Sequence, residues 1–271
     1  MSETATQNFN EILKSLTEIS NSFNVSIYIP SLKQTVDFKE LNTKQQKELL
    51  ETVTDTSIYK TKFAQTFLQI IKENLISNDI NIDELTIYDK IFIGLFLRSK
   101  ISNTLNFIFK EEPLYSESVE LKPIIDECVK YTHPQLDKIT IVKDGVTIGV
   151  ELKIPTIVLE SKYEAELSKT YKKIDDVKSV NDMGSLLSDA FVGEVSKYIS
   201  KISFDDKIVE LENLTINQRI RLTELLTADL TQKVLQKIAD WKTELDEYLT
   251  ISSKEGEYKK AITIDNLLFL M

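Results

Sequence analysis

Residues 36–51 read VDFKELNTKQQKELLE, and residues 209–224 read VELENLTINQRIRLTE. Both stretches run from a short β-type segment through a polar cap into an amphipathic helix. The matching positions are Asn42 with Thr215, Gln45 with Gln218, and Leu49 with Leu222. In each copy, the cap and the glutamine three residues later predict a capping box, in which side chains satisfy free backbone groups at a helix start. A true duplication and an independent convergence on one local solution both explain the repeat.

Short strands with tight turns are expected before and between the helices. Val25–Pro30 and Gln34–Phe38 alternate as the strands of a hairpin, and Lys138–Leu152 forms a second hairpin around Asp144-Gly145, a pair that suits a type I′ turn. A third hairpin turns at Asp205-Asp206 before the second helix. Elsewhere, apolar residues recur at steps of three and four, which predicts helices. The expected fold is α+β, mainly helical with short antiparallel hairpins and two hairpin-plus-helix units.

The sequence also predicts a division into two parts. The stretch Asp175–Asp182 is polar enough to act as a linker. We therefore expect an N-terminal hairpin and helix domain with a second hairpin over residues 1–174, and a C-terminal hairpin and helix domain over residues 175–271.

Composition narrows the function classes. The chain has 271 residues, 33 lysines and arginines, 43 acids and a net charge of -10, which argues against a nucleic-acid partner. Its longest apolar run, Ile91–Leu97, is far shorter than the roughly 20 residues that span a bilayer. The start, Met1–Asn10, is polar, so no secretory segment is expected. One cysteine and one histidine fit a reducing cytoplasm.

The possible metal sites fail on their ligands. The run Asp79–Asp83 resembles the first half of a calcium loop, but Glu84 stands where the loop needs glycine and Lys90 where it needs a bidentate acid. Cys128 and His133 have no further cysteine or histidine to complete a zinc site. We therefore expect no metal ligand, no cofactor-binding residue and no cofactor.

Catalytic sites are equally poorly supported. Cys128 as nucleophile with His133 as base is the enzyme alternative, although no nearby acid carries a recognisable signature. Consecutive acids such as Glu111-Glu112 point apart on a strand or turn and do not converge on one substrate bond. Six glycines without a phosphate-binding loop give nucleotide binding no support. No catalytic residue and no small-molecule substrate are predicted.

Several stretches of the chain follow the pattern of one known family, namely Val36–Gln45, Ile82–Leu85, Tyr88-Asp89, Ile93–Lys100, Ile154–Thr156 and Val195–Leu270. Together they resemble the baseplate protein family of T-even-like contractile-tailed bacteriophages. In that family, a strand-turn-strand leads into a capped helix, and a leucine-rich helix later ends in Leu-Arg, a small residue and Lys. The sequence IGLFLRSK at residues 93–100 follows this order. The resemblance covers nearly the whole chain, but this chain lacks the cysteine pairs with which several relatives could bind zinc.

The resemblance implies a non-enzymatic protein of the tail baseplate, either a hub subunit or a hub-assembly factor. Its partners would be other phage tail and baseplate proteins, in the host cytoplasm during assembly and, for a permanent component, in the virion baseplate. A transient assembly chaperone, absent from the mature virion, is the alternative within this class. The expected partner contacts are Phe9, Ile12, Leu16, Arg98, Leu267 and Phe269. Each of them also has a structural interpretation, as a core side chain or, for Arg98, as a cation favoured at a helix end.

Overall fold

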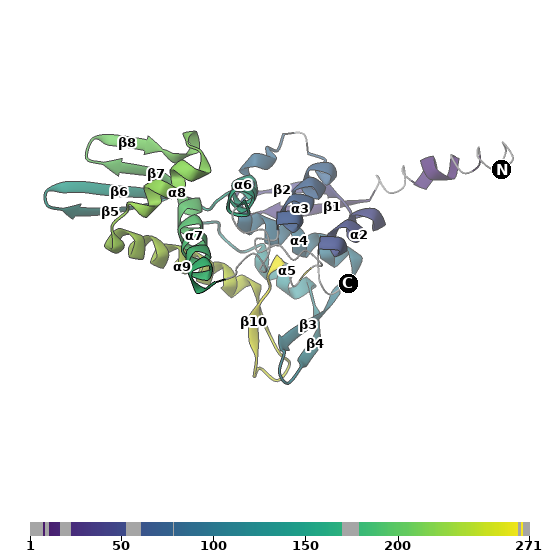
Figure 1. The fold of residues 1–271 in the computed structure, drawn as a ribbon. Coiled ribbons are helices and arrows are strands. Elements are labelled where there is room, and N and C mark those ends of the chain that lie inside the picture. The colour runs from purple at the N-terminus through teal and green to yellow at the C-terminus, as the bar shows by residue number, and fades with distance from the viewer. Residues whose placement is uncertain are drawn as a thin grey trace.

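The computed structural model describes residues 8, 11–16, 23–52, 61–77, 79–169, 179–264 and 267. Its helices are α2 (Thr43–Glu51), α3 (Thr61–Asn74), α4 (Ile87–Ile101), α5 (Lys122–Cys128), α6 (Ile157–Leu167), α7 (Val180–Tyr198), α8 (Ile216–Glu224) and α9 (Ala228–Leu249). The described residues also include the short 3-10 helices η2 (Ile82–Glu84) and η4 (Leu211–Asn213). Residues 11–16 are also helical. Figure 1 shows most of the helices gathered in a central body, and the described strands form four separate antiparallel sheets.

Three of the sheets are hairpins and the fourth has four strands. The hairpins are β1 (Asn24–Ile29) with β2 (Gln34–Lys39), β3 (Thr104–Lys110) with β4 (Tyr115–Glu120), and β9 (Thr250–Ser252) with β10 (Lys259–Ala261). The larger sheet has the order β5 (Asp137–Lys143), β6 (Val146–Leu152), β7 (Ile199–Phe204) and β8 (Lys207–Glu210). Helices together with antiparallel sheets confirm the predicted α+β class.

The first hairpin forms one wall of the hydrophobic core. In the β1–β2 register, Ile27 lies opposite Val36 and Val25 lies opposite Phe38, and all four side chains are buried. Because side chains alternate between the faces of a strand, this arrangement directs one apolar face inward. Helix α4 packs against β1 and α3 contacts β2. One face of the hairpin thus packs on the core helices, and the other face points toward solvent.

Both predicted capping boxes are confirmed. The Asn42 side chain accepts from the backbone of Gln45, whose own side chain accepts from the Asn42 backbone. Thr215 and Gln218 repeat this exchange at the start of α8. Each cap satisfies a backbone donor that lacks an intrahelical partner, and so fixes where its helix begins.

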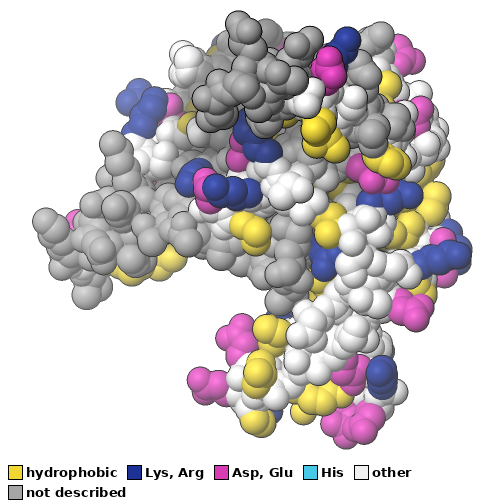
Figure 2. Space-filling model, turned by 90° about the vertical axis from the view of Figure 1, so that its right-hand side faces the viewer, with side chains coloured by type: hydrophobic (Ala, Val, Ile, Leu, Met, Phe, Trp, Pro, Cys, Tyr) yellow, Lys and Arg dark blue, Asp and Glu magenta, His cyan; other side chains and the backbone are white. Residues whose placement is uncertain are grey.

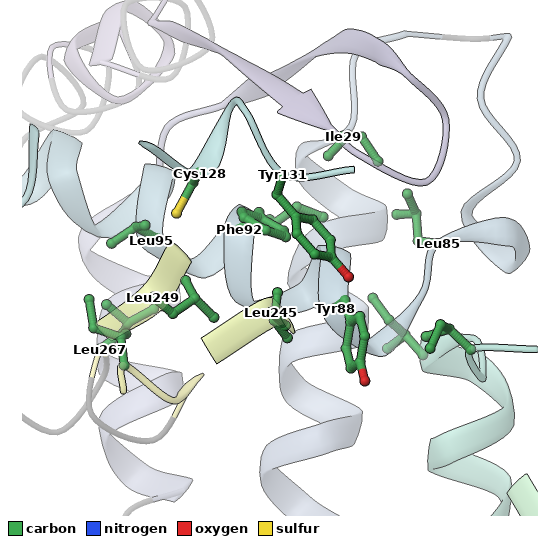
Figure 3. Close-up of a cluster of buried hydrophobic side chains, with 14 of the residues drawn as sticks. Ile29, Leu85, Tyr88, Phe92, Leu95, Cys128, Tyr131, Leu245, Leu249 and Leu267 are labelled. Carbon is green, nitrogen blue, oxygen red and sulfur yellow. The ribbon is translucent and has the colours of Figure 1, made fainter. Parts of the chain in front are cut away.

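Helix α4 is the centre of the core. Most of its side chains are buried, in keeping with an apolar sequence that has no polar stripe. Phe92 stacks on Tyr131, with ring centroids 5.5 Å apart. Figure 3 shows Phe92 and Leu95 of α4 together with Leu245 and Leu249 of α9 in the same apolar cluster. Residues from both ends of the chain therefore share one core.

The four-stranded sheet joins segments on either side of the predicted domain boundary. Strands β5 and β6 precede residue 175 and β7 and β8 follow it, yet β6 pairs with β7 from Ile148 opposite Phe204 to Leu152 opposite Ile199. The β5–β6 turn takes positive φ at Asp144 and Gly145, as its sequence predicts. Asp205 also has positive φ at the β7–β8 turn. The two predicted parts share this sheet and the core.

Two β projections extend from the helical body (Figure 1). One is the β5–β8 sheet, with α9 packed on β5. The other combines the β3–β4 and β9–β10 hairpins, which are linked by the rings of Tyr115 and Tyr258, 5.0 Å apart, and by a hydrogen bond of 3.0 Å from the Lys254 backbone to Glu117. Among the described helices, none combines the length and apolarity needed to cross a membrane.

Candidate functional site

Cys128 lies at the end of α5 and points into the core. Figure 3 shows it in a buried apolar cluster that includes Leu95, Leu249 and Leu267. The thiol donates to the carbonyl oxygen of Tyr248 over 3.7 Å. Burial, reinforced by the charge of Glu127, raises the pKa of Cys128 to about 12. Since the thiolate is the reactive form, this environment suits a core side chain and opposes a nucleophile.

His133 follows α5 in a loop and has different neighbours. Its Nδ1 lies 3.0 Å from the Pro134 carbonyl oxygen, and its Nε2 lies 3.2 Å from Oγ1 of Thr86. Burial lowers the pKa of His133, while the charge of Asp89 acts in the opposite direction. The imidazole is therefore held by an N-cap threonine and a carbonyl, and no hydrogen bond joins it to Cys128 among the described residues.

Asp89 is the carboxylate at this junction, and it is completely buried. Its Oδ2 accepts from the backbone N–H and the hydroxyl of Thr86, both at 2.7 Å. Ser31, in the β1–β2 turn, donates its hydroxyl to Oδ2 over 2.5 Å and its N–H to Oδ1 over 3.2 Å. Buried polar groups are stable when all are hydrogen-bonded. The junction thus fixes the β1–β2 turn, the start of α4 and the His133 loop to one another.

Arg98 is also buried, in the last turn of α4. Its Nη1 donates to the Ser102 carbonyl oxygen over 3.3 Å, and its Nη2 donates to that of Thr104 over 3.4 Å. Burial lowers the pKa of this guanidinium. The side chain connects the helix end to β3, where a cation also interacts favourably with the helix dipole.

The other expected partner contacts fall in three different settings. Ile12 and Leu16 lie in the helical residues 11–16 and are exposed. Leu267 is completely buried and belongs to the core cluster, so it presents no surface to a partner. Phe9 and Phe269 lie outside the described residues.

The β5–β8 sheet exposes apolar side chains that the sequence analysis did not single out. Val142, Phe204 and Ile208 are 71%, 50% and 61% exposed, with Phe204 on one face of the sheet and Val142 and Ile208 on the other. The register places Phe204 opposite Ile148, and Val209 opposite Ile202, so that these four side chains share one face. That face continues from the part of the sheet on which α9 packs. The apolar surface therefore extends beyond its covering helix.

The edge of this sheet is open as well. Strand β8 pairs only with β7 among the described strands, and all four of its residues are exposed. An edge strand presents backbone N–H and C=O groups to which another strand can pair. Together with the apolar face, this edge has the features of a protein-binding surface.

The second projection combines apolar and acidic groups. In Figure 2 the lower projection carries exposed hydrophobic side chains beside acidic ones. Leu114, between β3 and β4, is 69% exposed, next to Glu111 and Glu112 in the same turn. The hydrogen bond to Glu117 raises the pKa of Tyr115, and the charges of Glu255 and Glu257, in the turn between β9 and β10, add to this rise. The two turns thus contribute to one negative potential.

No protein-family model, curated protein or solved structure matches this chain in the comparisons.

Proposed function

We propose that this chain is a bacteriophage tail baseplate protein that acts without catalysis, through protein–protein contacts, as a hub subunit or a hub-assembly factor. The assignment to phage rests on the sequence resemblance over residues 93–100 and the other stretches named above. The mode of action rests on one structural observation, the open edge and partly uncovered apolar face of the β5–β8 sheet.

This surface favours binding over catalysis for a physical reason. Exposed apolar side chains such as Phe204 and Val209 lower the solubility of a protein that works alone, but they contribute to affinity when a partner covers them. A partner strand added at β8 would extend the sheet and enlarge the buried apolar face at the same time. The net charge of -10 disfavours self-association and favours a basic partner surface.

The alternative of a cysteine-dependent enzyme receives no support from the geometry around its two key residues. The Cys128 thiol is buried against Tyr248 with a raised pKa, while His133 bonds to Thr86 and Pro134. A cysteine nucleophile needs a base within hydrogen-bond reach and a lowered pKa. The Asp89 junction is instead saturated by donors from its own chain.

Mass spectrometry of purified tails and of infected-cell lysate tests the proposal. A few copies per tail identify a permanent hub component. Abundance in lysate, association with other tail proteins and absence from tails identify a transient assembly chaperone. Failure to associate with any tail protein in either sample contradicts the baseplate assignment.

Substitutions in the sheet test the mode of action separately. We expect Phe204→Ser combined with Val209→Ser, two exposed positions on the same face, to leave the fold intact and to reduce incorporation into tails, or co-purification with tail proteins, by about tenfold or more. Leu225→Ser is the matched control, because Leu225 is equally apolar and highly exposed but lies between α8 and α9. Equal incorporation of both variants would show that the sheet is not the contact surface.

A further inference from the structure

A cavity of about 330 Å³ lies where α6 begins, beside the start of β7 and the middle of α8. Its walls include Ile154, Pro155 and Leu159, which are apolar, and the cationic side chains of Lys162 and Arg219. Cavities of this size hold small ligands. None of its lining residues takes part in the proposed contact surface on the β5–β8 sheet.

The N-terminus of α6 supplies a free backbone donor to this cavity. The Thr156 hydroxyl caps the helix by accepting from the Leu159 N–H over 3.2 Å, and the Ile157 N–H donates to the Leu85 carbonyl oxygen over 2.8 Å. The N–H of Val158 lies between them and has no hydrogen-bond partner among the described residues. Val158 also lines the cavity. A free N–H at the positive end of the helix dipole favours an anion.

Arg219 provides a second and independent indication of a ligand. The side chain is only 3% exposed and lines the cavity from α8. Its Nη2 donates to the Ile199 carbonyl oxygen over 2.9 Å, and its guanidinium lies 5.4 Å from the centre of the Tyr163 ring. Its Nε has no hydrogen-bond partner among the described residues. The Nε is also shielded from solvent and does not itself face the cavity, but a buried guanidinium that lines the cavity with one hydrogen bond among the described residues suits an anionic ligand.

The charges around the cavity set the charge of that ligand. Four cations face it, Lys153, Lys162, Lys197 and Arg219, against the two acids Asp83 and Glu212. Lys153 is 3.8 Å from Glu212, and Lys197 is 2.5 Å from Glu194 behind it. Lys162 and Arg219 form no ion pair among the described residues. The excess of positive charge is therefore small, in a chain whose net charge is -10.

We propose that this cavity binds a carboxylate group attached to an apolar body, with the Val158 N–H, Arg219 and Lys162 as its donors. A carboxylate matches the small excess of positive charge better than a multiply charged phosphate, and a guanidinium donates well to a planar carboxylate. The hydrocarbon part of the ligand packs against Ile154, Pro155 and Leu159. A free organic acid and the end of a peptide chain present this same chemistry.

The test follows the Val158 backbone amide by NMR on the full chain while probes are added. The probes are butyrate, its neutral isostere butyramide, inorganic phosphate, and acetyl-Ala-Ala-Leu with a free or an amidated C-terminus. We expect millimolar binding of butyrate that shifts the Val158 amide, with no shift from butyramide. Tighter binding of the free-acid peptide than of butyrate identifies a chain end as the source of the ligand, and equal binding identifies a small acid.

Variants connect this binding to the cavity. Lys162→Gln, at an exposed position, is expected to weaken butyrate binding about threefold, because one charge-assisted contact is lost near solvent. Arg219→Lys is expected to weaken it about tenfold or more, because the planar fork of donors is lost. Lys233→Gln, on α9, is the matched control and leaves binding unchanged. Absence of any carboxylate-induced shift, tighter phosphate binding, equal butyramide binding, or an unchanged affinity in Lys162→Gln would each overturn the proposal.

Discussion

The two hairpin-plus-helix units share a sequence pattern and a capped helix, but they differ in burial. In the first unit Val36 is 1% exposed, whereas its counterpart Val209 in the second is 39% exposed. Gln45 is buried, whereas Gln218 is exposed. A shared local sequence therefore specifies the cap and the helix start, while the surrounding elements decide which side chains the core encloses.

The neighbours of each unit explain this difference. The first hairpin has α4 on β1 and α3 on β2, and its turn is fixed by Ser31 bonding to Asp89. The second hairpin pairs with β6, and its turn is fixed by Asp205, which accepts from the Thr147 N–H over 2.9 Å. The first unit thus lies under helices, while the second extends a sheet into solvent. One unit stabilises the fold, and the other has a surface that remains available.

The largest expected effect comes from placing a charge at the matched valines. Val36→Asp puts a carboxylate into a closed apolar core, and we expect it to lower the free energy of unfolding by more than about 4 kcal/mol. Val209→Asp places the same group on a partly exposed strand and is expected to cost less than about 1 kcal/mol. Urea unfolding followed by circular dichroism measures both values. Equal destabilisation would mean that the two units are equally enclosed, in conflict with the different exposure of Val36 and Val209.

The two glutamines sharpen the comparison at a smaller scale. Gln45 exchanges two hydrogen bonds with the buried side chain of Asn74, of 2.8 and 3.1 Å, in addition to its role in the cap. Gln45→Ala leaves Asn74 buried without its partner, and we expect a loss of about 2 kcal/mol. Among the described residues the Gln218 side chain bonds only to Thr215, so that Gln218→Ala is expected to cost about 0.5 kcal/mol.

The double variant Gln45→Ala with Asn74→Ala provides the control for this prediction. If the cost arises from an unsatisfied amide, removing both partners should restore part of the stability lost in Gln45→Ala. A double variant that loses the full sum of the two single effects would contradict a direct coupling between these side chains.

Local signals in the sequence were sufficient to predict the caps and turns. Asn42, Thr215 and the pair Asp144-Gly145 act through contacts within a few residues, so their roles follow from residue type and spacing. Strand β4, helix α5 and the β9–β10 hairpin were not predicted. Strand β4 alternates between half-buried and exposed side chains and has no apolar face, and β9 and β10 are three residues each. Such segments form strands because neighbouring strands of the chain pair with them, and their own sequence gives little indication of it.

The sites could be predicted even less well than the fold. The Asp89 junction brings Ser31 and His133 together from distant parts of the chain, and no spacing in the sequence indicates that contact. The shared β5–β8 sheet likewise depends on β6 pairing with β7 across the polar stretch that suggested a domain boundary. The hydrophobic pattern predicted a helix around Ile12 and Leu16, and residues 11–16 are helical. The pattern does not tell whether these side chains are exposed or buried, because that depends on tertiary packing.

The caps themselves should respond alike in the two units, despite the difference in burial. Asn42 and Thr215 are both exposed, and each accepts one backbone N–H at a helix start. Replacing either by alanine is expected to cost about 1 kcal/mol, because an N-cap acts locally. Asn42→Ser and Thr215→Ser are the matched controls, since serine retains a capping oxygen. A cost that differs severalfold between the two alanine variants would show that tertiary contacts, rather than the cap, determine it.

The smallest expected effect is a pH dependence confined to the first unit. Burial lowers the pKa of His133 from its ordinary value of 6.5, so the unfolded chain binds a proton more readily than the folded one. Stability from this group is therefore present above about pH 6.5 and is lost as the pH falls. The nearby Asp89 carboxylate, which favours the protonated imidazole, keeps this loss small. His133→Gln removes the titration while retaining an amide that can bond to Thr86.

The free energy of unfolding is measured for the wild type and for His133→Gln at about pH 7.5 and at about pH 5.5. The difference between the two proteins isolates the effect of His133 protonation from that of the carboxylates. We expect the wild type to lose more stability than the variant over this range. Amide hydrogen exchange should then accelerate in β1 and β2, whose turn is bonded to the Asp89 junction, and not in β7 and β8, whose turn is bonded to Thr147. Equal acceleration in both hairpins would contradict this prediction. It would mean that protonation of His133 destabilises the whole fold, and not only the hairpin that is bonded to the Asp89 junction.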